Sequence, residues 1–517
     1  MNAIHRLGQR LHRFVLCALD SPKFFIIVIG ILVFQSLWIA LSARFPQAFD
    51  ENFHLGLIQL HAEQWLPYFV NHPPGAELYG AVTRDPSYFY HYIFSFPYRA
   101  LQAVTDSLAI QIIVLRLMNI GLFVWGLFVA RRLLQEIGAS RRIMHVVLLF
   151  FVLTPIMPLL AAHINYDNLI FPLTGLLLLA VVRFLRILGD NQQVSVGQLL
   201  LFAGIGMLAA IVKYTVTPLL LAGVVVFVIS LWHVYRRGIR PTWVIDIPRG
   251  VLGVVVAMSL VGLSFLFVER YGLNLIRYQS PQPDCAKVLT VEQCSAYSPW
   301  VRDHLYAASY PKPTTQGIAV YPFVWAHRMV FETMFVISSR FYPDGKRVEY
   351  WPWPPMTVGN YAAWTIVGIG GLLTAYWLKR FWKLTLLRVL LLMIAFYTIV
   401  LFIKNFSMYL HTGEAMAIHG RYLIPVYPVL YLVLALAFGW TLDRFRKPSY
   451  KVWLTLLTLV LFFQGSALVV WIQRSHPEWY WQQNSLVAEV NQTAKSVLRY
   501  TTAPDIQLWR GPWYPPQ

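Results

Sequence analysis

The feature that most constrains this chain is a series of apolar runs, each about 20 residues long. A helix of that length crosses the hydrocarbon core of a bilayer and satisfies its own backbone polar groups. The first run is too long for the core of a cleaved signal peptide, so we interpret it as a retained anchor. The pattern predicts an all-α polytopic membrane protein with about 11 transmembrane helices, at residues 24–44, 108–130, 143–162, 168–187, 197–213, 215–233, 247–269, 357–378, 385–404, 420–440 and 452–472.

The distribution of charge predicts which helix ends face the cytoplasm. Lysine and arginine cluster in short turns on one side, whereas most carboxylates lie in the segments on the other side. The positive-inside rule then places the N-terminus in the cytoplasm and the C-terminus outside. The net charge of +19 is spread over these turns rather than gathered on one module. It therefore indicates membrane lipid or a phosphate-bearing ligand as partner, and no nucleic acid.

Three segments on the outer side are long, and connections of such length are usually functional or form small domains. They divide the chain into a cytoplasmic N-terminus (1–23), an N-terminal transmembrane module (24–269) that includes the outer loop 45–107, an extracytoplasmic loop (270–356), C-terminal transmembrane helices (357–472) and an extracytoplasmic tail (473–517).

The cysteines fit this topology. Cys285 and Cys294 lie close together in the second outer segment, and Cys17 stands alone on the cytoplasmic side. A pair outside and a single thiol inside predict a disulfide between Cys285 and Cys294. Two free thiols are the alternative.

The first outer loop begins with two adjacent carboxylates, Asp50 and Glu51. The residues that follow have helical apolar spacing, which predicts an interfacial helix, and the aromatic block 88–96 predicts a second one. Two neighbouring carboxylates beside the membrane repel each other, so one can have a raised pKa and act as a general base. The alternatives are capping of the helix by Asp50 and a metal site formed by Glu51, His54 and His61.

Two further carboxylates stand out. Asp85 precedes Tyr88 in the same loop, where tyrosine rings can stack on the apolar face of a sugar. An ordinary aromatic belt is the alternative. Asp167 lies in a short outer turn that fixes it between two helix ends, and capping of the next helix is the alternative there.

Basic and aromatic side chains also lie at the outer ends of the predicted spans. They are Lys213 and Tyr214 after the fifth span, Lys404 at the end of the ninth, and His419, Arg421 and Tyr422 at the start of the tenth. Ionisable groups at this depth are costly and are functional candidates, with snorkelling as the alternative. Together the cations can hold a phosphate, for which Arg421 offers a bidentate fork.

This pattern resembles the C-type (GT-C) superfamily of membrane glycosyltransferases, which use polyprenyl-phosphate sugars. The nearest likeness is to a bacterial branch of unassigned function associated with surface polysaccharides. The matching stretches are Asp50-Glu51-Asn52-Phe53-His54, Asn165-Tyr166-Asp167-Asn168, Lys213-Tyr214-Thr215, the loop from Cys285 to Cys294 with Tyr297-Ser298-Pro299-Trp300, and Gly420-Arg421-Tyr422-Leu423-Ile424-Pro425.

The resemblance implies roles for four residues. Asp50 would deprotonate the acceptor, Glu51 would share or orient that role, Asp167 would position the donor or a metal, and Arg421 would bind the carrier phosphate. We expect transfer of a hexose or pentose to a glycan, lipid or protein on the outer face of a bacterial inner membrane. A divalent cation is the candidate cofactor. The alternatives are a transporter or flippase for a lipid-linked or anionic solute, and a polysaccharide polymerase or ligase.

Overall fold

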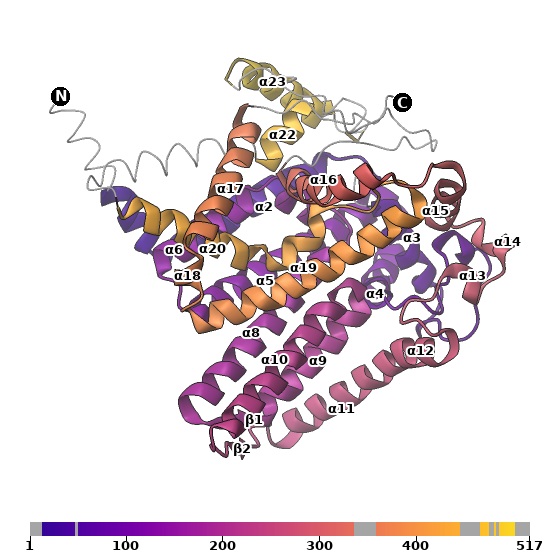
Figure 1. The fold of residues 1–517 in the computed structure, drawn as a ribbon. Coiled ribbons are helices and arrows are strands. Elements are labelled where there is room, and N and C mark those ends of the chain that lie inside the picture. The colour runs from indigo at the N-terminus through magenta and orange to yellow at the C-terminus, as the bar shows by residue number, and fades with distance from the viewer. Residues whose placement is uncertain are drawn as a thin grey trace.

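The computed structural model describes residues 13–46, 50–334, 358–444, 466–474, 480–481 and 485–501. Within these ranges the strands are two three-residue segments, β1 (Gln193–Ser195) and β2 (Thr242–Val244), which pair in parallel. Figure 1 shows the long helices packed side by side. The helices are α2 (Phe24–Ser42), α3 (Glu51–Ala62), η1 (Ala76–Tyr79), α4 (Phe89–Val104), α5 (Leu108–Ile137), α6 (Arg141–Leu153), α7 (Ile156–Ala161), α8 (Asp167–Asn191), α9 (Val196–Val212), η2 (Tyr214–Val216), α10 (Thr217–Arg236), α11 (Gly250–Phe267), η3 (Val268–Gly272), α12 (Leu273–Tyr278), α13 (Cys285–Val288), α14 (Val291–Cys294), α15 (Ser298–Ser309), α16 (Thr315–Met334), α17 (Val358–Tyr376), α18 (Leu378–Phe381), α19 (Thr385–Thr412), η4 (Gly420–Val426), α20 (Tyr427–Leu442), α22 (Ala467–Arg474) and α23 (Ser485–Thr501).

The described residues contain seven helical segments long and apolar enough to cross a membrane, which confirms an integral membrane protein. They are Phe24–Ser42, Leu108–Ile137, Asp167–Asn191, Tyr214–Arg236, Gly250–Tyr278, Thr385–Thr412 and Gly420–Leu442. Two shorter apolar helices, Val196–Val212 and Thr365–Tyr376, coincide with further predicted spans. The span expected at 143–162 is divided into α6 and α7 around Thr154 and Pro155.

The count of 11 spans is not confirmed. Most of the last predicted span, at 452–472, lies outside the described residues, as do residues 1–12 of the expected N-terminus, residues 335–356 of the second outer segment and most of the tail 473–517.

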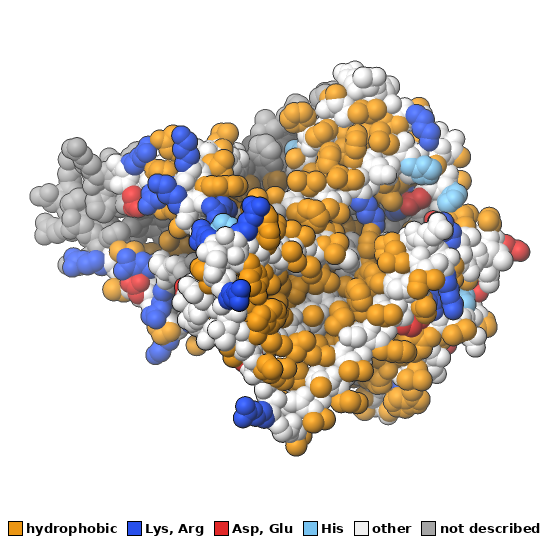
Figure 2. All heavy atoms as spheres, turned by 60° about the horizontal axis from the view of Figure 1, so that its bottom comes forward, with side chains coloured by type: hydrophobic (Ala, Val, Ile, Leu, Met, Phe, Trp, Pro, Cys, Tyr) orange, Lys and Arg blue, Asp and Glu red, His pale blue; other side chains and the backbone are white. Residues whose placement is uncertain are grey.

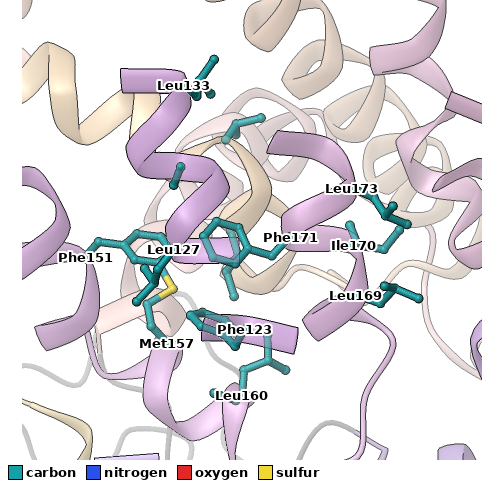
Figure 3. Close-up of a cluster of buried hydrophobic side chains, with 14 of the residues drawn as sticks. Phe123, Leu127, Leu133, Phe151, Met157, Leu160, Leu169, Ile170, Phe171 and Leu173 are labelled. Atoms are coloured by element: carbon teal, nitrogen blue, oxygen red, sulfur yellow. The ribbon is translucent and has the colours of Figure 1, made fainter. Parts of the chain in front are cut away.

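Helices α5 and α8 form the centre of the fold. Figure 3 shows Phe123 of α5 beside Phe151 and Phe171, and the ring centroids of Phe123 and Phe171 are 4.9 Å apart. The close approach depends on Gly126, because the Phe171 ring occupies the space that a Cβ at that position would need. This packing fixes the N-terminal part of α8, where Asp167 is the first residue.

The two ends of the helical bundle differ in chemistry. At the end that includes the C-termini of α5 and α8, Glu136 accepts ion pairs from Arg132 at 2.8 Å and from Arg186 at 2.9 Å. The exposed pair Asp20–Arg142 (2.6 Å) lies where α6 begins. Figure 2 shows hydrophobic side chains over much of the face between the charged regions. Helix α11 contributes to this apolar surface, since none of the residues from Gly250 to Phe267 is buried.

The long segments that the charge pattern predicts to lie outside pack at the opposite end. Both expected helices of the first loop are present as α3 and α4, and α3 is buried over most of its surface rather than along one face. The second segment contains the expected Cys285–Cys294 disulfide, with 5.9 Å between the Cα atoms, whereas Cys17 is free and exposed. The Tyr297 ring packs against Gly80, which joins the disulfide segment to the first loop.

Candidate active site

Two carboxylates and two cations from four distant parts of the sequence meet at this end of the bundle. Arg421 Nη2 lies 3.0 Å from Asp50 Oδ2, and Arg421 Nε lies 4.0 Å from Asp167 Oδ2. The Lys213 ammonium donates to Asp167 Oδ1. Three of these side chains are 10% exposed or less, but the Asp50 side chain is 62% exposed. The cluster therefore has one accessible carboxylate above a buried set of charges.

Local backbone structure turns Asp50 toward Arg421. Asp50 precedes α3 with φ = 60°, a left-handed conformation that aspartate tolerates better than most residues. Its side chain makes no capping hydrogen bond, so the capping alternative is wrong. Displacement of water by the surrounding protein would raise the pKa of the carboxyl, but the Arg421 guanidinium outweighs this effect and holds the pKa below its usual range.

Asp167 is held from several sides. Asn165 Oδ1 accepts a hydrogen bond from the Asp167 backbone N–H at 2.8 Å, and Asp167 is the first residue of α8 rather than its N-cap. The Lys213 Nζ lies 4.5 Å from the centre of the Tyr166 ring and 4.7 Å from that of Tyr422. These rings and the ion pair fix the Lys213 ammonium beside the carboxylate.

Glu51 forms a separate ion pair with Arg116 of α5. Its two carboxylate oxygens accept from Arg116 Nε at 2.8 Å and from Nη2 at 2.7 Å, and both side chains are 0% exposed. Arg116 Nη1 also donates to the carbonyls of Ala40 and Ala43, while the Ile164 backbone N–H donates to Glu51. The pair joins α2, α3, α5 and the turn before α8.

The prediction that one of the two adjacent carboxylates has a raised pKa is wrong, because the pKa of each is lowered. Burial would raise the pKa of Glu51, but Arg116 outweighs it and the pKa is lowered. Asp50 and Glu51 point to different guanidinium groups. The repulsion that the sequence suggested is therefore compensated at each carboxylate.

A directional hydrogen-bond chain links helices α3 and α4 to the turn before α8. Because Asn165 Oδ1 accepts from Asp167, its Nδ2 must donate to His54 Nε2, 3.0 Å away. A neutral His54 then donates through Nδ1 to His91 Nε2 at 2.9 Å. Burial holds the pKa of both histidines well below their usual range, in agreement with neutral rings.

We expect Asn165→Asp to reverse this chain. The new carboxylate accepts at both ends, so His54 must donate through Nε2 and becomes an imidazolium if it keeps its bond to His91. The added negative charge beside Asp167 also competes for the Lys213 ammonium, so activity of the site should fall about ten- to hundredfold. The ¹⁵N NMR spectrum of histidine-labelled protein at pH 7 reports which ring nitrogen of His54 carries a proton, and an unprotonated Nε2 in the variant would contradict the deduced chain.

His61 lies on the same helix as His54, with 1% of its surface exposed. Neither ring nitrogen has a hydrogen-bond partner among the described residues. Burial, with a smaller contribution from the positive charge of Arg270, lowers the pKa of His61 to about 3. The ring is therefore neutral in the folded protein throughout the physiological range.

This depressed pKa predicts acid sensitivity. Below pH 6.5 His61 binds a proton in the unfolded chain but stays neutral in the folded protein. The contribution of His61 to the free energy of unfolding is therefore complete above pH 6.5 and is lost as the pH falls toward 3. Between pH 6.5 and 5 we expect a loss of about 2 kcal/mol. Denaturation midpoints measured against pH should show a smaller slope in His61→Leu, whereas the exposed His304→Gln should keep the wild-type slope. Equal slopes in all three proteins would contradict the assignment of the acid sensitivity to His61.

A second charged cluster, which the sequence did not reveal, lies beside the first loop. Glu269 accepts from Arg84 at 2.8 Å and lies 3.3 Å from Arg270 Nε. Both Glu269 and Arg270 belong to η3, a π-helical turn, and such turns occur frequently at functional sites. A charged pair inside an otherwise apolar run is the sequence signal that could have identified it.

Asp85 and Tyr88 belong with this second cluster rather than with Asp50. Burial raises the pKa of Asp85, whose Oδ1 accepts from the Ser87 backbone N–H at 2.9 Å. Tyr88 is 1% exposed, and the Arg270 guanidinium lies 4.2 Å from its ring centre. Because the ring is covered, this position argues against the expected use of Tyr88 as a sugar platform.

The remaining candidate residues differ in whether they contact the four charged side chains. His419 Nδ1 accepts from the Arg421 backbone N–H at 3.1 Å, and Tyr422 lies against Lys213. Lys404 is exposed, with its Nζ 4.1 Å from the ring centre of Tyr214, and among the described residues it forms no ion pair. Lys404 is therefore placed beside the cluster rather than within it.

The described residues include no group of three histidine, cysteine or acidic side chains arranged to hold a metal ion. Glu51 and His54 of the suggested metal site instead face Arg116 and the His91–Asn165 chain.

No protein-family model matches the sequence, and no curated protein matches it. Among solved structures, the chain is similar to ArnT from Cupriavidus metallidurans bound to undecaprenyl phosphate, with 14% identity and a TM-score of 0.41 over 85% of this chain and 64% of that one. The apo state of ArnT from the same organism gives 12% identity and a TM-score of 0.42 over 92% of this chain and 77% of that one.

A third similar structure is the archaeal oligosaccharyltransferase AglB from Archaeoglobus fulgidus in complex with an inhibitory peptide and a dolichol-phosphate. Its identity is 12% and its TM-score 0.41, over 96% of this chain and 62% of AglB. The chain thus spans less than two thirds of the length of AglB and of the lipid-bound ArnT structure.

Proposed function

We propose that this protein is a membrane glycosyltransferase that moves a sugar from a polyprenyl-phosphate donor to a hydroxyl of a glycan, lipid or protein acceptor. The observation that carries the proposal is the pairing of an accessible carboxylate, Asp50, with a buried guanidinium, Arg421, that also reaches Asp167. A base that is open to an acceptor and a cation that can stabilise an anionic leaving group are the two groups that such a transfer needs.

The proposed location of the reaction is the extracytoplasmic face. The cluster lies at the N-termini of α8 and η4, whereas the C-terminal end of α8 is bounded by the basic residues Arg183 and Arg186. The positive-inside rule assigns basic ends to the cytoplasm, which supports an outer site with the N-terminus inside and the C-terminus outside.

The proposed reaction is a displacement with inversion. The acceptor hydroxyl gives its proton to the Asp50 carboxylate while its oxygen forms a bond to the anomeric carbon. The bond from that carbon to the phosphate oxygen breaks, and its electron pair leaves with the polyprenyl phosphate. Arg421 and Lys213 stabilise the charge on that phosphate, while Asp167 holds Lys213 in place. Glu51 acts indirectly, because its ion pair with Arg116 positions the start of α3.

Purified protein and cells together test this function. Protein in proteoliposomes should transfer a labelled sugar from a polyprenyl-phosphate donor to an acceptor, and cells without the gene should lack one surface sugar and accumulate its lipid-linked donor. Mass spectrometry of lipids and glycans measures both. Flux of a lipid-linked solute without any transfer would favour a transporter or flippase, and full dependence on His419 rather than Asp50 would favour a polymerase or ligase.

A further inference from the structure

The charges at the site are balanced before any ligand binds. Asp50 and Asp167 supply two negative charges, and Arg421 and Lys213 supply two positive charges, each in contact with a carboxylate. A phosphodiester donor adds one more negative charge to this partly buried group. An uncompensated buried charge is costly, so the donor phosphate must take the place of a carboxylate on one of the cations.

The two carboxylates differ in how easily they can be displaced. The Asp167–Lys213 pair is buried, with both side chains 3% exposed, and Asn165 fixes the backbone of Asp167. Asp50 is 62% exposed, makes no capping hydrogen bond and lies 3.0 Å from the Arg421 guanidinium. An anion that enters from outside therefore meets the weaker of the two pairs first.

The geometry of the reaction also requires this pair to open. In a displacement with inversion, the base and the group that stabilises the leaving phosphate act on opposite sides of the anomeric carbon. In inverting sugar hydrolases the two acting carboxyl groups are about 6.5–9.5 Å apart. The 3.0 Å contact between Asp50 and Arg421 leaves no room for a sugar between them.

We propose that the donor phosphate replaces Asp50 on Arg421, so that the catalytic carboxylate is released only when the donor is bound. This inference rests on the proposed function and adds an order of events to it. The contact with Arg421 makes Asp50 a weaker base in the ligand-free protein, since it holds the pKa of the carboxyl low. Loss of the contact restores its basicity at the moment when the anomeric carbon is in place.

The inference predicts that removal of the competing carboxylate tightens donor binding. In Asp50→Asn the side chain keeps its size and tolerates the left-handed backbone, but it no longer competes as an anion for Arg421. We expect the dissociation constant for undecaprenyl phosphate, measured with protein in nanodiscs, to fall about five- to tenfold. Asp50→Glu keeps the competing charge and should bind with nearly wild-type affinity.

A matched control separates this local effect from a general change in charge. Glu63 is exposed and follows the other end of α3, about 20 Å along the helix from Asp50. Glu63→Gln removes the same charge at a distance beyond the Debye length of about 8 Å and should leave the dissociation constant unchanged. Weaker or equal binding by Asp50→Asn, or an equal gain in Glu63→Gln, would overturn the inference. Turnover of a sugar donor by the wild-type protein reports separately on the proposed function.

Discussion

Asp50→Asn is expected to lower the rate of sugar transfer by about 10²–10⁴-fold, because the acceptor hydroxyl loses its general base. The variant should still fold and insert. The Asp50 side chain is 62% exposed and makes no capping bond, and the amide oxygen of the substituted side chain can still accept a hydrogen bond from the buried Arg421. The measurement is the initial rate with a labelled polyprenyl-phosphate donor, together with the thermal unfolding midpoint of each variant.

Two comparisons make the result specific. Glu63→Gln removes a carboxylate from the other end of α3 and should transfer at the wild-type rate. In Asp50→Asn the loss should lie in kcat, while the affinity for the lipid phosphate is improved. Wild-type turnover by Asp50→Asn would falsify the assignment of the base, and an unfolded variant would show that Asp50 has a structural role that its exposure does not suggest.

The membrane-spanning segments could be predicted because hydropathy and helix length depend on local sequence alone. The interruption between α6 and α7 was not predicted, although Pro155 gave a local signal for it. The burial of α3 over most of its surface was also missed. Its apolar spacing fits one buried face, but Leu55 and Ile58 pack into the main core while Leu57 and Leu60 pack against the loop that follows. Which faces are covered depends on contacts between distant segments.

The candidate site likewise has features that local sequence predicts and features that depend on contacts between distant segments. The order of the spans placed Asp50, Asp167, Lys213 and Arg421 at one membrane level, and the structure brings these four side chains together. Their pairing was not predictable, because a sequence shows the depth of a residue but not the direction of its side chain. The burial of Tyr88 under Arg270 and the pairing of Glu51 with Arg116 are set by such directions.

The Glu51–Arg116 pair predicts the largest effect on stability. Removal of one partner of a buried ion pair leaves an uncompensated charge and typically costs about 3–5 kcal/mol. Arg116→Met should be the most severe single change, because it also leaves the carbonyls of Ala40 and Ala43 without this donor. Glu51→Gln should cost less, since its amide oxygen still accepts a hydrogen bond. Unfolding free energies in detergent or nanodiscs measure both.

The double variant Glu51→Leu/Arg116→Met tests the cause of the loss. Without either charge the site is apolar, so the double variant should be more stable than Arg116→Met alone, although it removes more native contacts. If the two losses simply add, the ion pair is not what stabilises the start of α3.

The same variants decide between a catalytic and a positioning role for Glu51. A positioning residue acts through the placement of Asp50, so Glu51→Gln should lose transfer in proportion to its loss of stability and should keep the wild-type dependence of kcat on pH. A group that takes the proton itself would instead abolish kcat without any change in the unfolding midpoint. Because Glu51 is 0% exposed and held at both oxygens by Arg116, we expect the first result. An acceptor hydroxyl could reach Glu51 only if Arg116 were displaced, and that displacement would leave two buried charges apart.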